Sequence, residues 1–133
     1  MRIGILNVVE SGHRVIDAIK PAVLEFLGGK VVAAGNLFAD VVDLSNVEKT
    51  LQETITRVDA ALEHMLPRID VLVFVFSGPY IVAYTAAQRV LRRAAYKIVL
   101  LAQFDVANKR YVFVEDSELF RILHGGVKRG CSC

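Results

Sequence analysis

The stretch Val71–Pro79, VLVFVFSGP, constrains the fold more than any other part of the chain. Its first six residues are apolar without alternation. As a strand it would be hydrophobic on both faces and would lie in the middle of a sheet that is covered on both sides. An Ala-rich helical pattern begins directly after Ser77-Gly78-Pro79, and Pro79 suits the first turn of a helix. The stretch therefore predicts a strand, a tight turn and a helix N-terminus, which in open α/β sheets is the edge where ligands bind.

The remaining apolar patterns repeat this alternation of strand and helix. Three such units with buried-type strands predict an α/β fold, a Rossmann-like three-layer sandwich whose mostly parallel sheet carries a C-terminal antiparallel strand. We expect further strands at Arg2–Val9, Lys30–Asn36, Lys97–Phe104 and Tyr111–Glu115, the last antiparallel and at the edge of the sheet. We expect four helices. The first spans Arg14–Leu27 and should kink or restart at Pro21. The second begins at a capping box formed by Ser45 and Glu48, carries an apolar stripe and ends at Pro67. The other two span Pro79–Ala95 and Ser117–Leu123.

The length and composition fit one domain, which we place at residues 1–126, with a flexible tail at 127–133. Although 54% of the 133 residues are hydrophobic, no apolar run approaches the ~18 residues of a membrane span. The first residues, MRIGILNVV, lack the features of a signal peptide. We therefore expect no membrane contact and a cytoplasmic protein, and the residue usage leans towards a thermophilic source.

The net charge of +2 conceals an asymmetry between the two halves of the chain. Residues 1–76 carry 7 Lys and Arg against 10 Asp and Glu, a net −3, whereas residues 77–133 carry 9 against 4, a net +5. The basic half suits an anionic ligand, and it equally suits an oligomer in which oppositely charged faces meet. A surface for nucleic acid is a weaker alternative, because aromatic residues are not interleaved with the basic ones.

The sequence predicts neither a metal site nor a cofactor. Its two cysteines, Cys131 and Cys133, form a terminal Cys-Ser-Cys without a second ligand pair, so they are either incidental thiols or partners in an intermolecular disulfide. The three histidines, His13, His64 and His124, are scattered along the chain. The glycine patterns of dinucleotide-binding and P-loop proteins are absent as well.

Two predicted strand ends share one edge of the sheet, and both carry small polar residues and glycine. Backbone N–H groups at a helix N-terminus, together with the helix dipole, can hold a phosphate or carboxylate there. Ser77 is open to a second interpretation, in which it only caps the helix that follows. The predicted ligand-binding residues are Asn7, Ser11, Gly12, His13, Ser77, Gly78, Pro79 and Tyr80.

Three residues are candidates for catalysis at the same edge. His13 could act as a general base or contact a phosphate, Ser77 could supply a hydroxyl, and Asp105 could orient a base or a metal. Each has a plain structural alternative: a solvated loop for His13, helix capping for Ser77 and initiation of a turn with Asn108 for Asp105. A Ser-His-Asp hydrolase is not supported, because the G-x-S-x-G elbow is missing.

From residue 71 onward the chain resembles small CRISPR-associated proteins with a CARF-like Rossmann fold, which bind or cleave cyclic oligoadenylate. The matching segments are VLVFVFSGPY, IVLLAQFD and RYVFVEDSEL, which lie within residues 71–119, about a third of the chain. The ring-cleaving members carry histidines in the helix and at the end of the returning strand, and an Asp-Pro-Arg turn. This chain has no helix histidine, Asp116 at the strand end and Asp105-Val106-Ala107 in the turn, so only Asp105 carries over. The resemblance implies ligand binding by a homodimer across a two-fold axis more than nuclease chemistry.

Three functions remain open at this point. The first is a homodimeric Rossmann-like domain that binds a nucleotide-type anionic ligand, such as cyclic oligoadenylate, at the strand ends. The second is a small phosphodiesterase or ring nuclease that uses the three catalytic candidates. The third is a structural or interaction protein without a small ligand.

Overall fold

The computed structural model describes residues 1–10, 12 and 14–115 of the chain. The predicted helix Ser117–Leu123, the domain boundary at residue 126 and the tail at 127–133 lie outside these residues. Along the chain the elements are β1 (Arg2–Val9), α1 (Val15–Leu27), β2 (Lys30–Phe38), α2 (Val47–Met65), a 3-10 turn (Leu66–Arg68), β3 (Val71–Val75), α3 (Tyr80–Arg93), β4 (Ile98–Asp105) and β5 (Arg110–Glu115).

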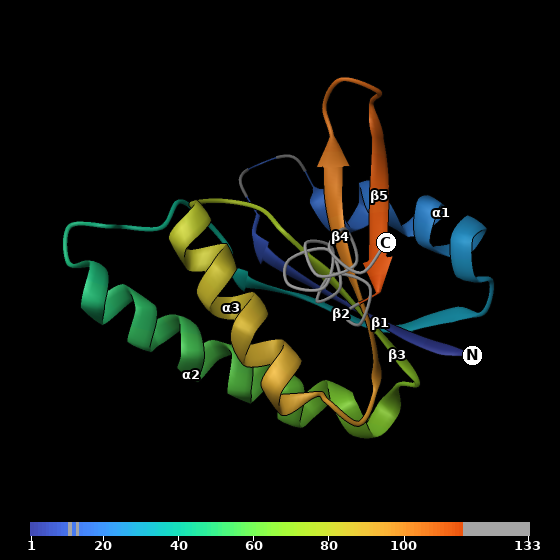
Figure 1. Ribbon diagram of the computed structural model, residues 1–133, viewed down its shortest axis with the longest axis horizontal. Coiled ribbons are helices and arrows are strands. Elements are labelled where there is room, and N and C mark those ends of the chain that lie inside the picture. The colour runs from blue at the N-terminus through green and yellow to red at the C-terminus, as the bar shows by residue number, and fades with distance from the viewer. Residues whose placement is uncertain (11, 13, 116–133) are drawn as a thin grey trace, which may run out of the picture.

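The five strands form one sheet in the order β2-β1-β3-β4-β5. The first four run parallel, and β5 pairs antiparallel with β4 at the edge. Helix α1 covers one face of the sheet, and α2 and α3 cover the other (Figure 1). The predicted α/β sandwich with a mostly parallel sheet is therefore confirmed.

The handedness of the connections explains this division of the helices. Crossovers between parallel strands are right-handed. The step from β1 to β2 runs one way along the sheet, and the steps from β2 to β3 and from β3 to β4 run the other way. The first helix consequently lies on one face and the next two on the opposite face. The reversal falls between β1 and β3, so their adjacent carboxyl ends form the topological switch point.

Burial of the central strands matches the sequence pattern. All five residues of β3 and seven of the eight in β1 are buried. Ile3, Ile5, Val73 and Val75 pack towards Ile19 and Val23 of α1. The opposite core, towards α2 and α3, includes Leu6, Val8, Leu72, Phe74, Val58, Leu62, Val82, Ala86 and Val90.

Strand β2 is two residues longer than predicted. The predicted strand ended at Asn36, but β2 continues through Leu37 and Phe38 because Asn36 pairs with Asn7 and Phe38 pairs with Val9 of β1. Both Leu37 and Phe38 are buried. Pairing with β1 thus extends β2 beyond the residues in which its own sequence pattern predicts a strand.

The expected capping box at the start of α2 is wrong. Asn46 is the N-cap, and its side chain accepts a hydrogen bond from Lys49 N at 3.1 Å, while Ser45 N donates to Asp43 instead. The predicted apolar stripe of this helix is confirmed at Val58, Leu62 and Met65, which are buried, and fails in the first turns. Val47 is exposed, whereas Thr50 and Thr54 are buried with their hydroxyls bonded to backbone carbonyls.

Two other helix predictions need correction. Helix α1 continues from Val15 to Leu27 without a restart at Pro21. Helix α3 begins at Tyr80, with Pro79 at the N-cap rather than in the first turn. None of the described helices is long and apolar enough to cross a membrane.

An ion pair joins the two helices on the shared face. Arg89 of α3 donates two hydrogen bonds to Asp59 of α2, at 2.8 and 2.7 Å. These hydrogen bonds lower the pKa of the Asp59 carboxyl, and Arg93 nearby adds to the effect. The pair is partly shielded from solvent, so it helps to fix the α2–α3 packing.

We predict that this pair gives part of the acid sensitivity of the fold. The pKa of Asp59 is lower in the folded chain than the ordinary 3.8. Its contribution to the free energy of unfolding is therefore complete above pH 3.8 and disappears as pH falls through the folded pKa. Urea unfolding between pH 5 and pH 2 should show a smaller loss of stability in Asp59→Asn than in the wild type. Glu63→Gln on the same helix, which has no ion-pair partner among the described residues, should behave as the wild type. Equal acid sensitivity of Asp59→Asn and wild type would contradict the prediction.

Candidate functional site

The carboxyl ends of β1 and β3 lie side by side, at the one edge of the sheet that the sequence predicted them to share. Asn7 of β1 is opposite Val75 of β3 in the parallel register. The chain leaving β3 passes Ser77 directly beside the end of β1, where Val9 N donates to Ser77 Oγ at 2.9 Å. The two predicted strand ends therefore meet at the switch point.

Asn7 is the polar centre of this edge. Its side chain is fully buried, and its amide nitrogen donates to Asn36 Oδ1 of β2 at 2.9 Å and to Val9 O at 3.0 Å. Its amide oxygen accepts from Ser77 Oγ at 2.7 Å. Because a buried amide must have partners, Asn7 ties the ends of β2, β1 and β3 together. In this arrangement it offers no exposed atom to a ligand.

Ser77 joins strands rather than capping the helix after it. Its hydroxyl has one hydrogen, which it shares between Asn7 Oδ1 and Val9 O, and it accepts from Val9 N. Helix α3 has no side-chain cap. The amide oxygen of Asn7 is not basic enough to take a proton, so the geometry does not activate Ser77 as a nucleophile.

The turn after Ser77 requires glycine at position 78. Gly78 has a φ of 75°, a conformation that side chains other than glycine rarely adopt. A Cβ there would also collide with the side chain of Val9. Pro79 follows in extended conformation, its carbonyl accepts from Val82 N and Ala83 N, and Tyr80 is 76% exposed.

The other predicted ligand loop follows β1. Gly12 is exposed with a φ of 86°, and Glu10 accepts a hydrogen bond from Val15 N at the start of α1. Ser11 and His13 lie outside the described residues, so their predicted roles stay predictions.

Asp105 has the turn-forming role that was one of its two interpretations. It accepts hydrogen bonds from Ala107 N, Asn108 N and Asn108 Nδ2, at 3.1, 3.3 and 2.7 Å. The Asn108 side-chain bond is the main cause that lowers the pKa of Asp105, which keeps it ionised and makes it a weak base. Its carboxylate is engaged within the β4–β5 turn.

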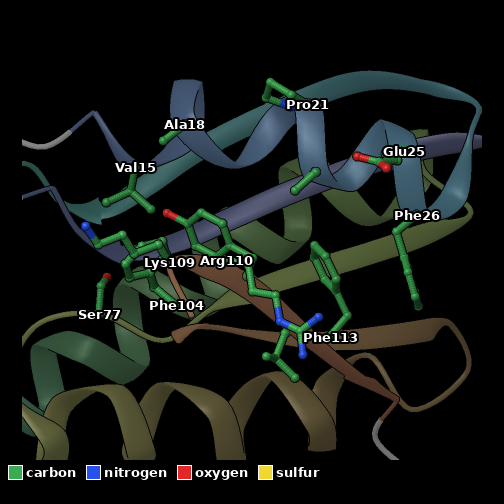
Figure 2. A pocket seen from close by; sticks show the side chains of 13 residues that line it. Val15, Ala18, Pro21, Glu25, Phe26, Ser77, Phe104, Lys109, Arg110 and Phe113 are labelled. Carbon is green, nitrogen blue, oxygen red and sulfur yellow. The ribbon is translucent and has the colours of Figure 1, made fainter. Parts of the chain in front are cut away.

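A groove of about 1250 Å³ opens between α1 and the β4–β5 hairpin. Figure 2 shows Ser77 and Lys109 at one end of this groove and Glu25 and Phe26 at the other. Small residues of α1 form one wall, and aromatic residues of the hairpin form the opposite wall. The lining residues are Val15, Ala18, Pro21, Ala22, Glu25, Phe26, Ser77, Phe104, Lys109, Arg110, Tyr111, Val112 and Phe113.

The aromatic side chains that form one wall of the groove pack against other aromatic rings. Phe104 and Tyr111 are cross-strand partners with ring centroids 5.1 Å apart. Phe113 stacks on Phe26 of α1 at 4.9 Å, which bridges the groove at its far end. The pKa of Tyr111 is raised mainly by burial of its side chain and further by the negative charge of Glu10, so the phenol stays protonated.

Lys109 holds an unfavourable backbone conformation at the mouth of the groove. Its φ is 53°, the left-handed region, which costs an ordinary L-residue about 1–2 kcal/mol. Arg14, directly before α1, has a φ of 47°. Glycine would adopt this backbone conformation at a lower energetic cost than lysine. Such conformations are concentrated at functional sites.

The sequence-based prediction missed the hairpin half of this groove. Phe104, Tyr111 and Phe113 were assigned only to strands, and Lys109 lay between the two predicted strands without a role. A signal was nevertheless present, because Tyr111 and Phe113 alternate on one face of an edge strand and a lysine precedes them at the turn. An edge strand with two aromatic residues on one face indicates a surface that something covers.

Within residues 1–10, 12 and 14–115 no group of three or more His, Cys, Asp or Glu side chains is arranged to hold a metal ion. Comparisons with protein-family models, curated proteins and solved structures found no match to the chain. The resemblance to the CARF-like family therefore stays a prediction.

We predict that Ser77 contributes to stability through its place between the strands. Ser77→Ala leaves Val9 N and the Asn7 amide oxygen without this partner, and should lower the free energy of unfolding by about 1–3 kcal/mol. Thr85→Ala is a matched control, because its exposed hydroxyl bonds only to Ile81 O one turn back in α3. The control should change stability by less than about 0.5 kcal/mol. Similar losses for the two variants, measured by urea unfolding, would contradict the role assigned to Ser77.

Proposed function

We propose that the groove between α1 and the β4–β5 hairpin binds a nucleotide-type anionic ligand. The observation that carries the proposal is the combination of a cation and aromatic rings on one wall. Lys109 stands at the end of the groove near Ser77, and Phe104 and Tyr111 lie beside it. Aromatic rings stack on bases, and a lysine pairs with a phosphate.

The place of the groove in the fold supports an anionic ligand. Its cationic end is at the carboxyl edge of the sheet, where open α/β sheets bind ligands. Helix α1 begins at Val15 on the groove wall, so the positive end of the helix dipole lies at this end of the groove, where the Glu10 carboxylate accepts a hydrogen bond from Val15 N. The small side chains of Ala18 and Ala22 leave room for a flat ring against the helix.

Binding is better supported than catalysis. Two of the three catalytic candidates are engaged in the structure of the edge: Ser77 bonds to Asn7 and Val9, and Asp105 bonds within its turn. Neither has a described base or acid as its hydrogen-bond partner. A ligand held in this groove would meet the cations Lys109 and Arg110 near one end, the carboxylate of Glu25 at the other, and aromatic and apolar groups between them (Figure 2).

Calorimetric titration of the full chain with ATP, cyclic AMP and a linear tetra-adenylate tests the proposal. We predict that at least one of them binds and that added salt weakens its affinity, since a phosphate contact is electrostatic. Absence of binding by all three nucleotides, with the fold intact by circular dichroism, would contradict the proposed function.

Lys109→Gly gives a sharper prediction, because its two effects have opposite signs. Glycine relieves the left-handed backbone, so the free energy of unfolding should rise by about 0.5–1 kcal/mol. Loss of the ammonium group should lower the affinity for the nucleotide that binds by about tenfold. Lys30→Ala, at the opposite edge of the sheet where β2 begins, should keep wild-type affinity. If Lys109→Gly binds the nucleotide with wild-type affinity, Lys109 is not part of the binding site.

A further inference from the structure

Among the described residues that line the groove, Glu25 is the only acidic one. It lies on α1, at the end of the groove opposite Lys109 (Figure 2). Its side chain is exposed and forms no ion pair with any described residue. A carboxylate in the binding site of an anion is repulsive unless it faces a part of the ligand that donates hydrogen bonds. The chemistry of the ligand at this end of the groove is therefore constrained.

Glu25 is unfavourable for the helix that carries it. The last turn of a helix favours cations, because its free carbonyl groups give that end a partial negative charge. Helix α1 ends at Leu27, its last turn contains no basic residue, and Glu25 is located in that turn. A stabilising role within α1 does not account for a carboxylate at this position.

The helical repeat places Glu25 on the wall of the groove. The α1 wall contains a row of residues at intervals of three, four and three, which lie along one side of the helix: Val15, Ala18, Ala22 and Glu25. At the usual rise of a helix this row is about 15 Å long. On the opposite wall, the chain from Lys109 to Phe113 covers about 13 Å when extended. The span between the cationic end and Glu25 suits a single nucleotide with extended phosphates.

An aromatic pair bridges the groove beside Glu25. The rings of Phe26 and Phe113 stack with their centroids 4.9 Å apart, and Phe26 directly follows Glu25 in the chain. A base that stacks on an aromatic ring presents its edge, which carries the hydrogen-bonding groups, to the side of the stack. A base that stacks at this end of the groove would have the Glu25 carboxylate as a neighbour of its edge.

We propose that the groove selects guanine among the nucleotide bases, with the Glu25 carboxylate accepting hydrogen bonds from guanine N1–H and N2–H. This assignment rests on the nucleotide-binding function proposed above. A carboxylate can only accept hydrogen bonds, and it does so through two oxygens. Guanine carries two adjacent donors that match those oxygens. Adenine and cytosine place an acceptor nitrogen next to the amino group, and uracil has a carbonyl on each side of its N–H, so each would bring a lone pair against the carboxylate.

The two ends of the groove then complement the two ends of one guanine nucleotide. Lys109 and Arg110 line the end that takes the phosphates, and Glu25 lies at the end that takes the base. The reversed orientation would place the phosphates against Glu25 and lose both sets of contacts. The charge distribution along the groove thus determines the orientation of the ligand together with its base.

Calorimetric titration of the full chain with GTP, ITP and ATP tests the base preference. The three ligands share ribose and triphosphate, and the base of ITP keeps N1–H but lacks the N2 amino group. GTP should bind about tenfold more tightly than ATP or better, with ITP between them. Equal affinities for GTP and ATP would overturn the guanine preference and leave the groove as a nucleotide site. If none of the three binds, the guanine preference fails, and titration with cyclic AMP and tetra-adenylate then decides the proposed function.

Glu25→Gln should shift the preference towards adenine. The glutamine amide offers one acceptor and one donor, which complement adenine N6–H and N1, so the ratio of GTP to ATP affinity should fall by about tenfold or more. Glu63→Gln makes the same change at an exposed residue of α2, on the other face of the sheet, and should keep the wild-type ratio. The thermal midpoint of Glu25→Gln should equal or exceed that of the wild type, because a carboxylate leaves the C-terminal turn of α1. An unchanged affinity ratio in folded Glu25→Gln would overturn the role of Glu25.

Discussion

A single buried amide organises the carboxyl edge of the sheet. Asn7 has no exposure to solvent, so its donors and its acceptor must be satisfied by the protein. Asn36, Val9 and Ser77 supply these partners from the ends of β2, β1 and the chain leaving β3. The position of the turn at Gly78, and with it the start of α3, follows from this network, because Ser77 must reach across to β1.

The same constraint limits where the proposed ligand can bind. Since Ser77 is committed to β1 and Asn7 is buried, the α3 N-terminus offers backbone groups and an exposed Tyr80 but no described cation. Open space lies instead on the α1 face. A hairpin joins β4 to β5 where a helix would otherwise cross back, so among the described elements α1 alone covers that face, and the groove remains beside it.

The sequence predicted the fold well and the site in part, for physical reasons. Patterns of burial are local, so the strands, the mostly parallel sheet and the antiparallel edge followed from Val71–Phe76 and its counterparts, whereas the order of the strands in the sheet did not. That Asn7 and Ser77 lie at the same edge of the sheet followed from topology, but their hydrogen bond did not. What Ser77 bonds to could not be predicted, because capping and cross-strand bonding use the same hydroxyl. The groove was missed because its two walls, α1 and the hairpin, are brought together only by the tertiary fold.

The central claim is that the anion site is the groove and not the N-terminus of α3. A titration of the ¹⁵N-labelled full chain with ATP, followed by amide chemical shifts, tests it most directly. The account predicts that the largest shifts cluster at Ala18, Ala22 and the segment Lys109–Phe113, on the two walls of the groove. Shifts confined to Gly78, Tyr80 and the first turn of α3, with the groove amides unchanged, would contradict it.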